Sequence, residues 1–186
     1  MENIKNLLET LHLEKNIRLE DIPNVDLYVD QVVQLFENNY GDTTRTEDEK
    51  VLTKTMINNY AKGKLFIPIK NKKYSKEHMI LISLIYQLKG ALSINDIKSS
   101  LATLNERLMN EDTFELDTLY KDYLELTETN VENFKRDVDN RVTEVKAAAS
   151  FEDKELEKLL LLTSFVTMSN MYRRLAEKLV DDLKES

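Results

Sequence analysis

The sequence predicts an all-α or nearly all-α protein, because it has few chain-breaking residues and many apolar stripes at helical spacing. Its 186 residues include only three glycines and two prolines, too few for the tight turns of a fold rich in β-sheet. Hydrophobic residues make up 41% and charged residues 32%, as expected of a soluble, charge-rich helical protein. A chain of this length can bury one core, or form a small domain with a helical extension.

The N-terminal part is predicted to hold two helices and a loop. Glu2 to Leu13 places apolar residues on one helical stripe. A second helix follows an N-cap at Asn24, has Leu27 on its inner side, and ends at Asn39-Tyr40-Gly41, where the glycine signals a left-handed stop. Asp42 to Lys50 contains no apolar residue and is predicted to be a loop.

A short polar helix and a wing come next. Thr53 can cap this helix and Gly63 can close it. Its inner side carries Met56, Ile57 and Tyr60. Its outer side carries Lys54, Thr55, Asn58, Asn59 and Lys62. The β-leaning tract of residues 65–69 and the lysine turn of residues 70–73 predict a small two-stranded wing, which Pro68 confines to a sheet edge.

The remaining segments are predicted to be helical. Ser75 caps a central apolar helix that ends at Gly90, and Ser93 with Asp96 predicts a capped helix that reaches Leu108. The composition changes beyond Asn110, and we place a domain boundary there. The C-terminal part has no glycine or proline, and its long apolar stripes need a partner helix. These stripes span residues 114–124, 131–145 and 156–183.

No catalytic or metal-binding pattern stands out, so we expect neither an enzyme nor a cofactor. The chain has no cysteine, which excludes disulfides and thiol chemistry and is compatible with the cytoplasm. Glu9-x-x-His12 has the spacing of carboxylate-bridged metal sites, but that architecture needs two such motifs. We interpret it as a solvated helix face, and His78 as a local hydrogen-bonding or packing residue. The acid-rich residues 111–115 lack the ligand pattern of a calcium loop.

Neither end of the chain suggests a membrane partner. Met1 to Leu13 is interrupted by charged residues and lacks the apolar core of a secretory signal. The most apolar run, Leu159 to Met168, is far shorter than the ~20 residues that span a bilayer.

A basic segment is the feature that points to a partner. Lys50 to Lys76 contains eight lysines and no acid, so the rest of this chain of formal charge -8 carries -16 (-8 minus +8). The outer side of the polar helix could enter a major groove, where asparagine suits the edge of adenine and lysine suits guanine or phosphate. Lys70, Lys72 and Lys73 would reach flanking phosphates. On charge alone, lysines that only solubilise the surface explain the segment equally well.

Three motifs carry a family resemblance. Tyr60-Ala-Lys-Gly-Lys-Leu-Phe-Ile-Pro68 resembles the stretch after the recognition helix in the MerR family. Lys73-Tyr-Ser-Lys-Glu-His78 resembles the helix start that follows in that family. Ile85 to Ile97 resembles its junction between the third and fourth helices.

The wider pattern resembles a bacterial family related to MerR, the domain of unknown function numbered eighteen-thirty-six, from Leu19 to about Leu104. It implies a MerR-like winged helix-turn-helix in residues 1–110 and a helical bundle for dimerisation or effector binding in 111–186. The implied function is a sequence-specific transcriptional regulator that binds double-stranded DNA as a homodimer through its C-terminal helices, with a small-molecule effector in some relatives.

On this basis we expect two groups of DNA contacts. The base-reading candidates are Lys54, Thr55, Asn58 and Asn59. The backbone-contacting candidates are Lys62, Lys64, Lys70, Lys72, Lys73 and Tyr74.

Two other functions stay open. The fold could serve a helical adaptor that uses the acidic remainder to bind another protein. The C-terminal bundle could instead hold a small ligand in an apolar pocket, although plain core packing also explains its aromatic residues. These residues are Tyr120, Tyr123, Phe134, Phe165 and Tyr172.

Overall fold

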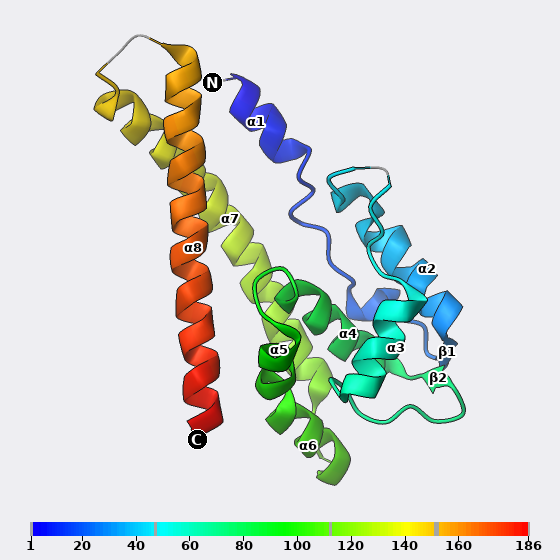
Figure 1. Ribbon diagram of the computed structural model, residues 1–186. Coiled ribbons are helices and arrows are strands. Elements are labelled where there is room, and N and C mark those ends of the chain that lie inside the picture. Colours follow the sequence, from blue (N-terminus) through cyan, green and yellow to red (C-terminus); the bar gives the residue numbers. More distant parts are fainter. Residues whose placement is uncertain (1, 47, 112, 151–152, 186) are drawn as a thin grey trace. The chain divides into compact units, whose positions relative to one another are not determined.

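A computed structural model describes residues 2–46, 48–111, 113–150 and 153–185. Glu47 of the predicted loop and Asp112 of the acid-rich stretch lie outside the described residues. The fold is mostly helical, with one small sheet (Figure 1), as the sequence predicts. The chain forms two compact units, Met1–Thr127 and Glu128–Ser186.

The elements follow one another in this order along the chain. They are α1 (Glu2–Glu9), η1 (Leu19–Asp21), β1 (Leu27–Tyr28), α2 (Val29–Tyr40), η2 (Gly41–Thr43), α3 (Lys54–Gly63), β2 (Lys73–Tyr74), α4 (Lys76–Leu88), α5 (Ile94–Ser100), α6 (Ala102–Asn110), α7 (Leu116–Ala148) and α8 (Lys154–Glu185). Helix α7 begins in the first unit and continues into the second.

Helix α4 forms the centre of the first unit, as its apolar composition predicts. Residues 78–83 are buried without interruption, and Ile80 and Ile85 have no exposed surface. A helix that is buried on every side needs apolar residues all round rather than on one stripe. Phe36 of α2 and Ile57 of α3 are also fully buried, so both helices contribute to the same unit's core.

The sheet differs from the predicted wing. Strand β2 pairs antiparallel with β1, in the register Leu27↔Tyr74 and Tyr28↔Lys73, and the tract 65–69 forms no strand. Leu27 therefore belongs to a strand and not to the second helix, which begins at Val29. An extended partner for β2 lies before α2 in sequence, and pairing with it buries both Leu27 and Tyr74.

Two predicted helix ends also differ. Gly41 has φ -54° and keeps a right-handed conformation, so it is not a left-handed stop. At the end of α3 the left-handed residue is Lys64, with φ 56°, whereas Gly63 is still helical. A side chain at Gly63 would meet the Leu65 Cδ1 atom at 2.7 Å, so the buried Leu65 side chain would have to move to admit it.

The predicted helix from Ser93 to Leu108 is divided at Leu101. This residue has φ -94° and ψ 0° and separates α5 from α6. Hydrogen bonds continue across the break, because the Leu101 N–H donates to the Ile97 carbonyl at 3.0 Å and the Asn105 N–H donates to the Leu101 carbonyl at 2.9 Å. The bend leaves Ile97, Leu101 and Asn105 buried.

A buried tyrosine pair fixes the segment before η1. The Tyr120 hydroxyl donates to the Ile17 carbonyl at 2.7 Å, and the Ile17 N–H donates to the Tyr40 hydroxyl at 3.3 Å. Ile17 itself has no exposed surface. The start of α7 is thereby joined to α2 and to the N-terminal segment within the first unit.

The second unit contains the rest of α7 and all of α8. The stripe predicted at 131–145 lies entirely on the continuous helix α7, and the stripe predicted at 114–124 lies on the same helix from Leu116 onward. Helix α8 carries exposed apolar side chains in two groups, at residues 159–166 and 172–183. Within each group the residues are three or four positions apart. They include Leu159, Leu162, Val166, Tyr172, Leu175, Leu179 and Leu183, each at least 52% exposed.

Candidate nucleic-acid interface

Helix α3 presents one polar face. The Thr53 hydroxyl accepts a hydrogen bond from the Met56 N–H at 3.1 Å, so this residue is the N-cap that the sequence predicts. Ile57 and Tyr60 are buried on the inner side. The outer side chains are all exposed, namely Lys54, Thr55, Asn58, Asn59 and Lys62.

Lys54 differs from the other lysines of this face because it has an acidic partner. Its ammonium forms an ion pair with Asp30 in the first turn of α2. Both side chains are more than half exposed, so the pair adds little stability. It does hold Lys54 at the junction of α2 and α3 and reduces the net positive charge there.

The turn after α3 places a lysine in an unfavourable backbone conformation. Lys64 is left-handed, and this turn lets the Leu65 N–H donate to the Tyr60 carbonyl at 3.0 Å and end the helix. Glycine is the usual residue at this position, because a Cβ there costs roughly 1–2 kcal/mol. The Lys64 side chain is exposed.

A second lysine occupies the same conformation in the turn before β2. Asn71 and Lys72 have φ 50° and 59°, and the Lys73 N–H donates to the Lys70 carbonyl at 2.9 Å. Two central residues with positive φ define a type I′ turn, for which Asn-Gly is the preferred pair. The turn thus has Asn in the favoured first place and Lys in the place that glycine would fill.

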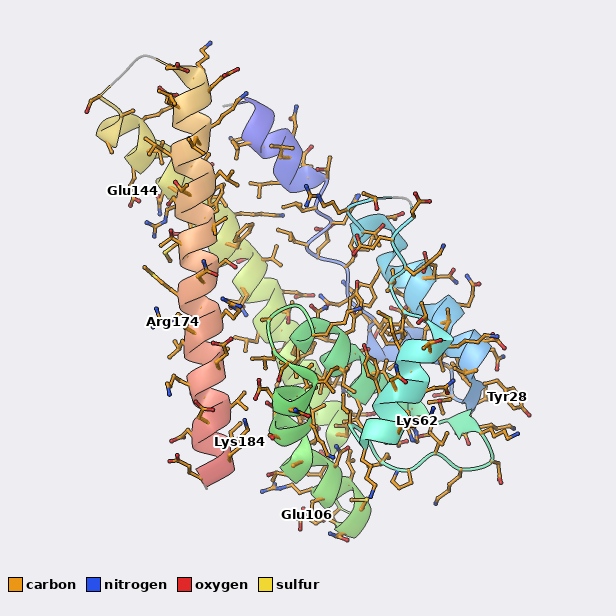
Figure 2. All side chains as sticks on the ribbon, viewed as in Figure 1. Tyr28, Lys62, Glu106, Glu144, Arg174 and Lys184 are labelled. Carbon is orange, nitrogen blue, oxygen red and sulfur yellow. The ribbon has the colours of Figure 1, made fainter. Side chains whose placement is uncertain are left out.

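The charges around these turns are mostly unneutralised. Among the described residues, no carboxylate lies within 4 Å of the ammonium groups of Lys62, Lys64, Lys70 or Lys72, and all four side chains are exposed. The Lys73 ammonium lies 5.3 Å from the centre of the exposed Tyr28 ring. Figure 2 shows the labelled side chains of Lys62 on α3 and Tyr28 on β1 in the same part of the unit.

Tyr74 and Lys76 are separate from this exposed group. Tyr74 is 2% exposed, and its ring lies edge-on to those of Phe66 and His78, so it lies with the core and not with the exposed lysines. Lys76 pairs with Asp117 of α7. The lysines predicted to contact the DNA backbone are therefore accessible, with Lys62, Lys64, Lys70 and Lys72 exposed and Lys73 half-buried.

His78 holds the loop beneath these lysines. Its Nε2 atom lies 3.1 Å from the Ile67 carbonyl, while its Nδ1 atom accepts the Ser75 N–H at 3.1 Å. The tautomer with the proton on Nε2 satisfies both contacts. Burial lowers the pKa of His78, since the charged imidazolium loses hydration there. The sequence predicts a local hydrogen-bonding or packing residue, and both roles are present.

The other predicted sites bring little together. Among residues 2–46, 48–111, 113–150 and 153–185, no three His, Asp or Glu side chains cluster so as to hold a metal ion. Tyr120 and Tyr123 stack in the first unit with ring centres 5.5 Å apart. Phe134 and Tyr172 of the second unit are 42% and 68% exposed. Within the part of the chain that the structure describes, no helix has the length and apolar character needed to cross a membrane.

Comparison with known proteins identifies a family. The model of a family described as "Domain of unknown function (DUF1836)" matches residues 17–123, which is more than half of the 186 residues. No curated protein matches the chain. No solved structure matches it either.

Proposed function

We propose that this chain, which belongs to the family described as a domain of unknown function (DUF1836), is a cytoplasmic, sequence-specific DNA-binding transcriptional regulator of MerR-like type. Helices α2 and α3 would form the helix-turn-helix pair, with α3 as the recognition helix. The turn of residues 70–73 would act as the wing. The residues after it continue into α4, which anchors both elements in the core.

The observation that carries this proposal is the position of two lysines at left-handed backbone sites. Lys64 and Lys72 both have positive φ, where glycine would cost less. A lysine that served solubility alone would be better placed one residue away. Strained residues of this kind gather at functional sites, and here both side chains are exposed cations with no carboxylate within 4 Å among the described residues.

The expected docking follows from the exposed face of α3. Asn58 and Asn59 lie in the middle of this face and would reach base edges in a major groove, with Thr55 and Lys54 beside them. Phosphates would be contacted by lysines at the end of α3 and at the two turns, whose charge acts without regard to sequence. These are the exposed Lys62, Lys64, Lys70 and Lys72 and the half-buried Lys73.

A homodimer is part of the proposal, because regulators with one recognition helix per chain read two half-sites. The exposed apolar residues of α8, among them Leu175 and Leu179 at 61% and 59% exposure, would be covered by the second copy. An isolated monomer would leave a long apolar stripe in water, which soluble monomers rarely do.

A helical adaptor remains the second candidate. It is favoured by the ion pairs Lys54–Asp30 and Lys76–Asp117, which use two lysines of the basic segment inside the protein. Against it stand the four exposed lysines without a nearby carboxylate. An adaptor would bind a protein partner and leave duplex DNA unbound at low salt.

The test is fluorescence anisotropy with the full chain and a labelled duplex at several salt concentrations. Five neutralised phosphates per protomer give a slope of log affinity against log salt of about -4.5. A variant with glutamine at positions 62, 64, 70 and 72 should retain a slope of about -0.9 per protomer. The control removes the same charge from exposed lysines elsewhere and should keep the full slope; it carries Lys98→Gln, Lys121→Gln, Lys135→Gln and Lys158→Gln.

Sequence reading is tested separately, by selecting preferred duplexes from a random pool. Asn58→Ala should broaden the selected motif at one position while leaving the salt slope unchanged. The assignment of these roles would be refuted if Asn58→Ala and the four-glutamine variant lost affinity and sequence preference to the same extent. It would also be refuted if the duplex did not bind at low salt.

A further inference from the structure

An apolar hollow lies between α3 and α6 and includes Lys64 of the proposed DNA-facing surface in its lining. It has a volume of about 510 Å³ and is lined by Ala61 and Lys64 at the end of α3, by residues 66–69, and by Asn105 and Met109 of α6. Sites for small molecules have this size and this mostly apolar lining. Figure 2 labels Lys62 on α3 and Glu106 on α6, the helices that border the hollow.

Asn105 is an unusual residue for the wall of such a hollow. Its side chain is buried, with 8% of the residue exposed, and its Nδ2 atom donates to the Leu65 carbonyl at 2.9 Å. Its Oδ1 atom is buried and has no hydrogen-bond partner among the described residues. A buried acceptor without a donor destabilises the fold. The amide oxygen therefore suits a molecule that brings a donor.

The remaining residues define the rest of that molecule. Residues 66–69 offer the apolar ring of Phe66 and the side chains of Ile67, Pro68 and Ile69 as a wall for a flat apolar body. Lys64 supplies an exposed ammonium with no carboxylate within 4 Å among the described residues. Met109 is 57% exposed and flexible, so it can adjust to an occupant.

We propose that this hollow binds a small ring-containing acid that carries a hydroxyl or N–H donor. The donor pairs with Asn105 Oδ1, the ring lies against residues 66–69, and the acidic group faces Lys64. Since Asn105 Oδ1 is closed to solvent in the empty hollow, its side chain turns slightly on binding.

The location gives the ligand a regulatory effect, which rests on the proposed function. The hollow borders the end of α3 and residues 66–69, so an occupant touches the end of the recognition helix and the segment that leads into the wing turn. An acid at Lys64 also neutralises one of the five proposed phosphate-binding cations. The occupied protein should therefore bind DNA more weakly, with its salt slope reduced in size by about 0.9 per protomer.

Binding is tested without DNA, by NMR of the ¹⁵N-labelled full chain. The first probes are 4-hydroxyphenylacetate and 4-methylphenylacetate, which differ only by a hydroxyl and a methyl group, followed by further matched pairs with two rings. We expect a hydroxyl-bearing probe to shift the Asn105 side-chain amide signals and to bind at least about 10-fold more tightly than its methyl partner.

Two variants separate a binding role from a structural one. Met109→Glu changes an exposed residue and should fold normally. It should weaken binding of the acidic ligand, because it places a like charge at the entrance of the hollow. Asn105→Leu should remove the preference for the hydroxyl probe. If no pair shifts the Asn105 amide, or if both members of each pair bind equally, the proposal is wrong and Asn105 serves only to hold Leu65. If binding occurs but duplex affinity is unchanged, the site stands and its coupling to DNA is refuted.

Discussion

The sharpest prediction concerns Lys72, because its backbone and its charge should have opposite effects when it is changed to glycine. At φ 59° a residue with a Cβ is strained by roughly 1–2 kcal/mol, and glycine removes this strain. Glycine also gives the unfolded chain more freedom, which destabilises the folded state by about 0.4–1 kcal/mol. Lys72→Gly should thus raise the free energy of unfolding by about 0.5–1 kcal/mol. Lys72→Ala keeps the Cβ and should change stability little.

Both variants should lose the same DNA contact. With five phosphate contacts, affinity per protomer falls about 500-fold between ~50 and ~200 mM salt, whereas four contacts give about 150-fold. Urea unfolding gives the stability difference, and anisotropy at the same salt concentrations gives the slope. A Lys72→Gly protein that is less stable than wild type would refute the strained-turn argument. One that is more stable but has the wild-type slope would refute the role of Lys72 at phosphate.

Three further predictions follow from the interior and from α8. Burial lowers the pKa of His78, so the contribution of the neutral imidazole to stability is complete above the ordinary pKa of about 6.5. This contribution is lost as the pH falls through the lowered pKa. Urea unfolding from about pH 8 to about pH 5 should therefore show a decrease in the free energy of unfolding that is absent in His78→Gln. Tyr120→Phe leaves the buried Ile17 carbonyl without its 2.7 Å donor and should cost about 1–3 kcal/mol, where an unchanged unfolding free energy would mean that water replaces the hydroxyl. Leu175→Lys, at a 61% exposed position, should give a monomer by light scattering if α8 pairs with a second copy, while Lys178→Gln should not.

Local signals predicted the parts of this fold that depend on neighbouring residues. Thr53, Ser75 and Ser93 are N-caps in the structure, as the sequence predicts, because a cap is decided within one helical turn. The helical character of residues 116–145 and the buried α4 follow equally from composition and spacing, whereas the continuity of α7 was left open. The exposed face of α3 could be listed in advance for the same reason.

The features missed depend on distant contacts or on unusual residue choices. The pairing of Leu27 with Tyr74 joins residues far apart in sequence, so no local pattern announces it. Lysine does not favour positive φ, so the sequence gives no signal for the left-handed conformation of Lys64 and Lys72. Counting lysines predicts the charge of the segment but not its backbone angles. The predicted helix from Ser93 to Leu108 is uninterrupted and does not single out Asn105, whereas the structure bends at Leu101 and buries Asn105.

The hydrogen bond from Tyr120 to Ile17 also sets conditions on how the protein is made. It joins residues 103 positions apart, so the first unit cannot close until Tyr120 has left the ribosome. At about 5–20 residues per second, Ile17 waits several seconds or more for its partner during synthesis. A fragment that ends at Asn110 would lack Tyr120 and so could not form this hydrogen bond, whereas residues 17–123, which the family model matches, include both Ile17 and Tyr120.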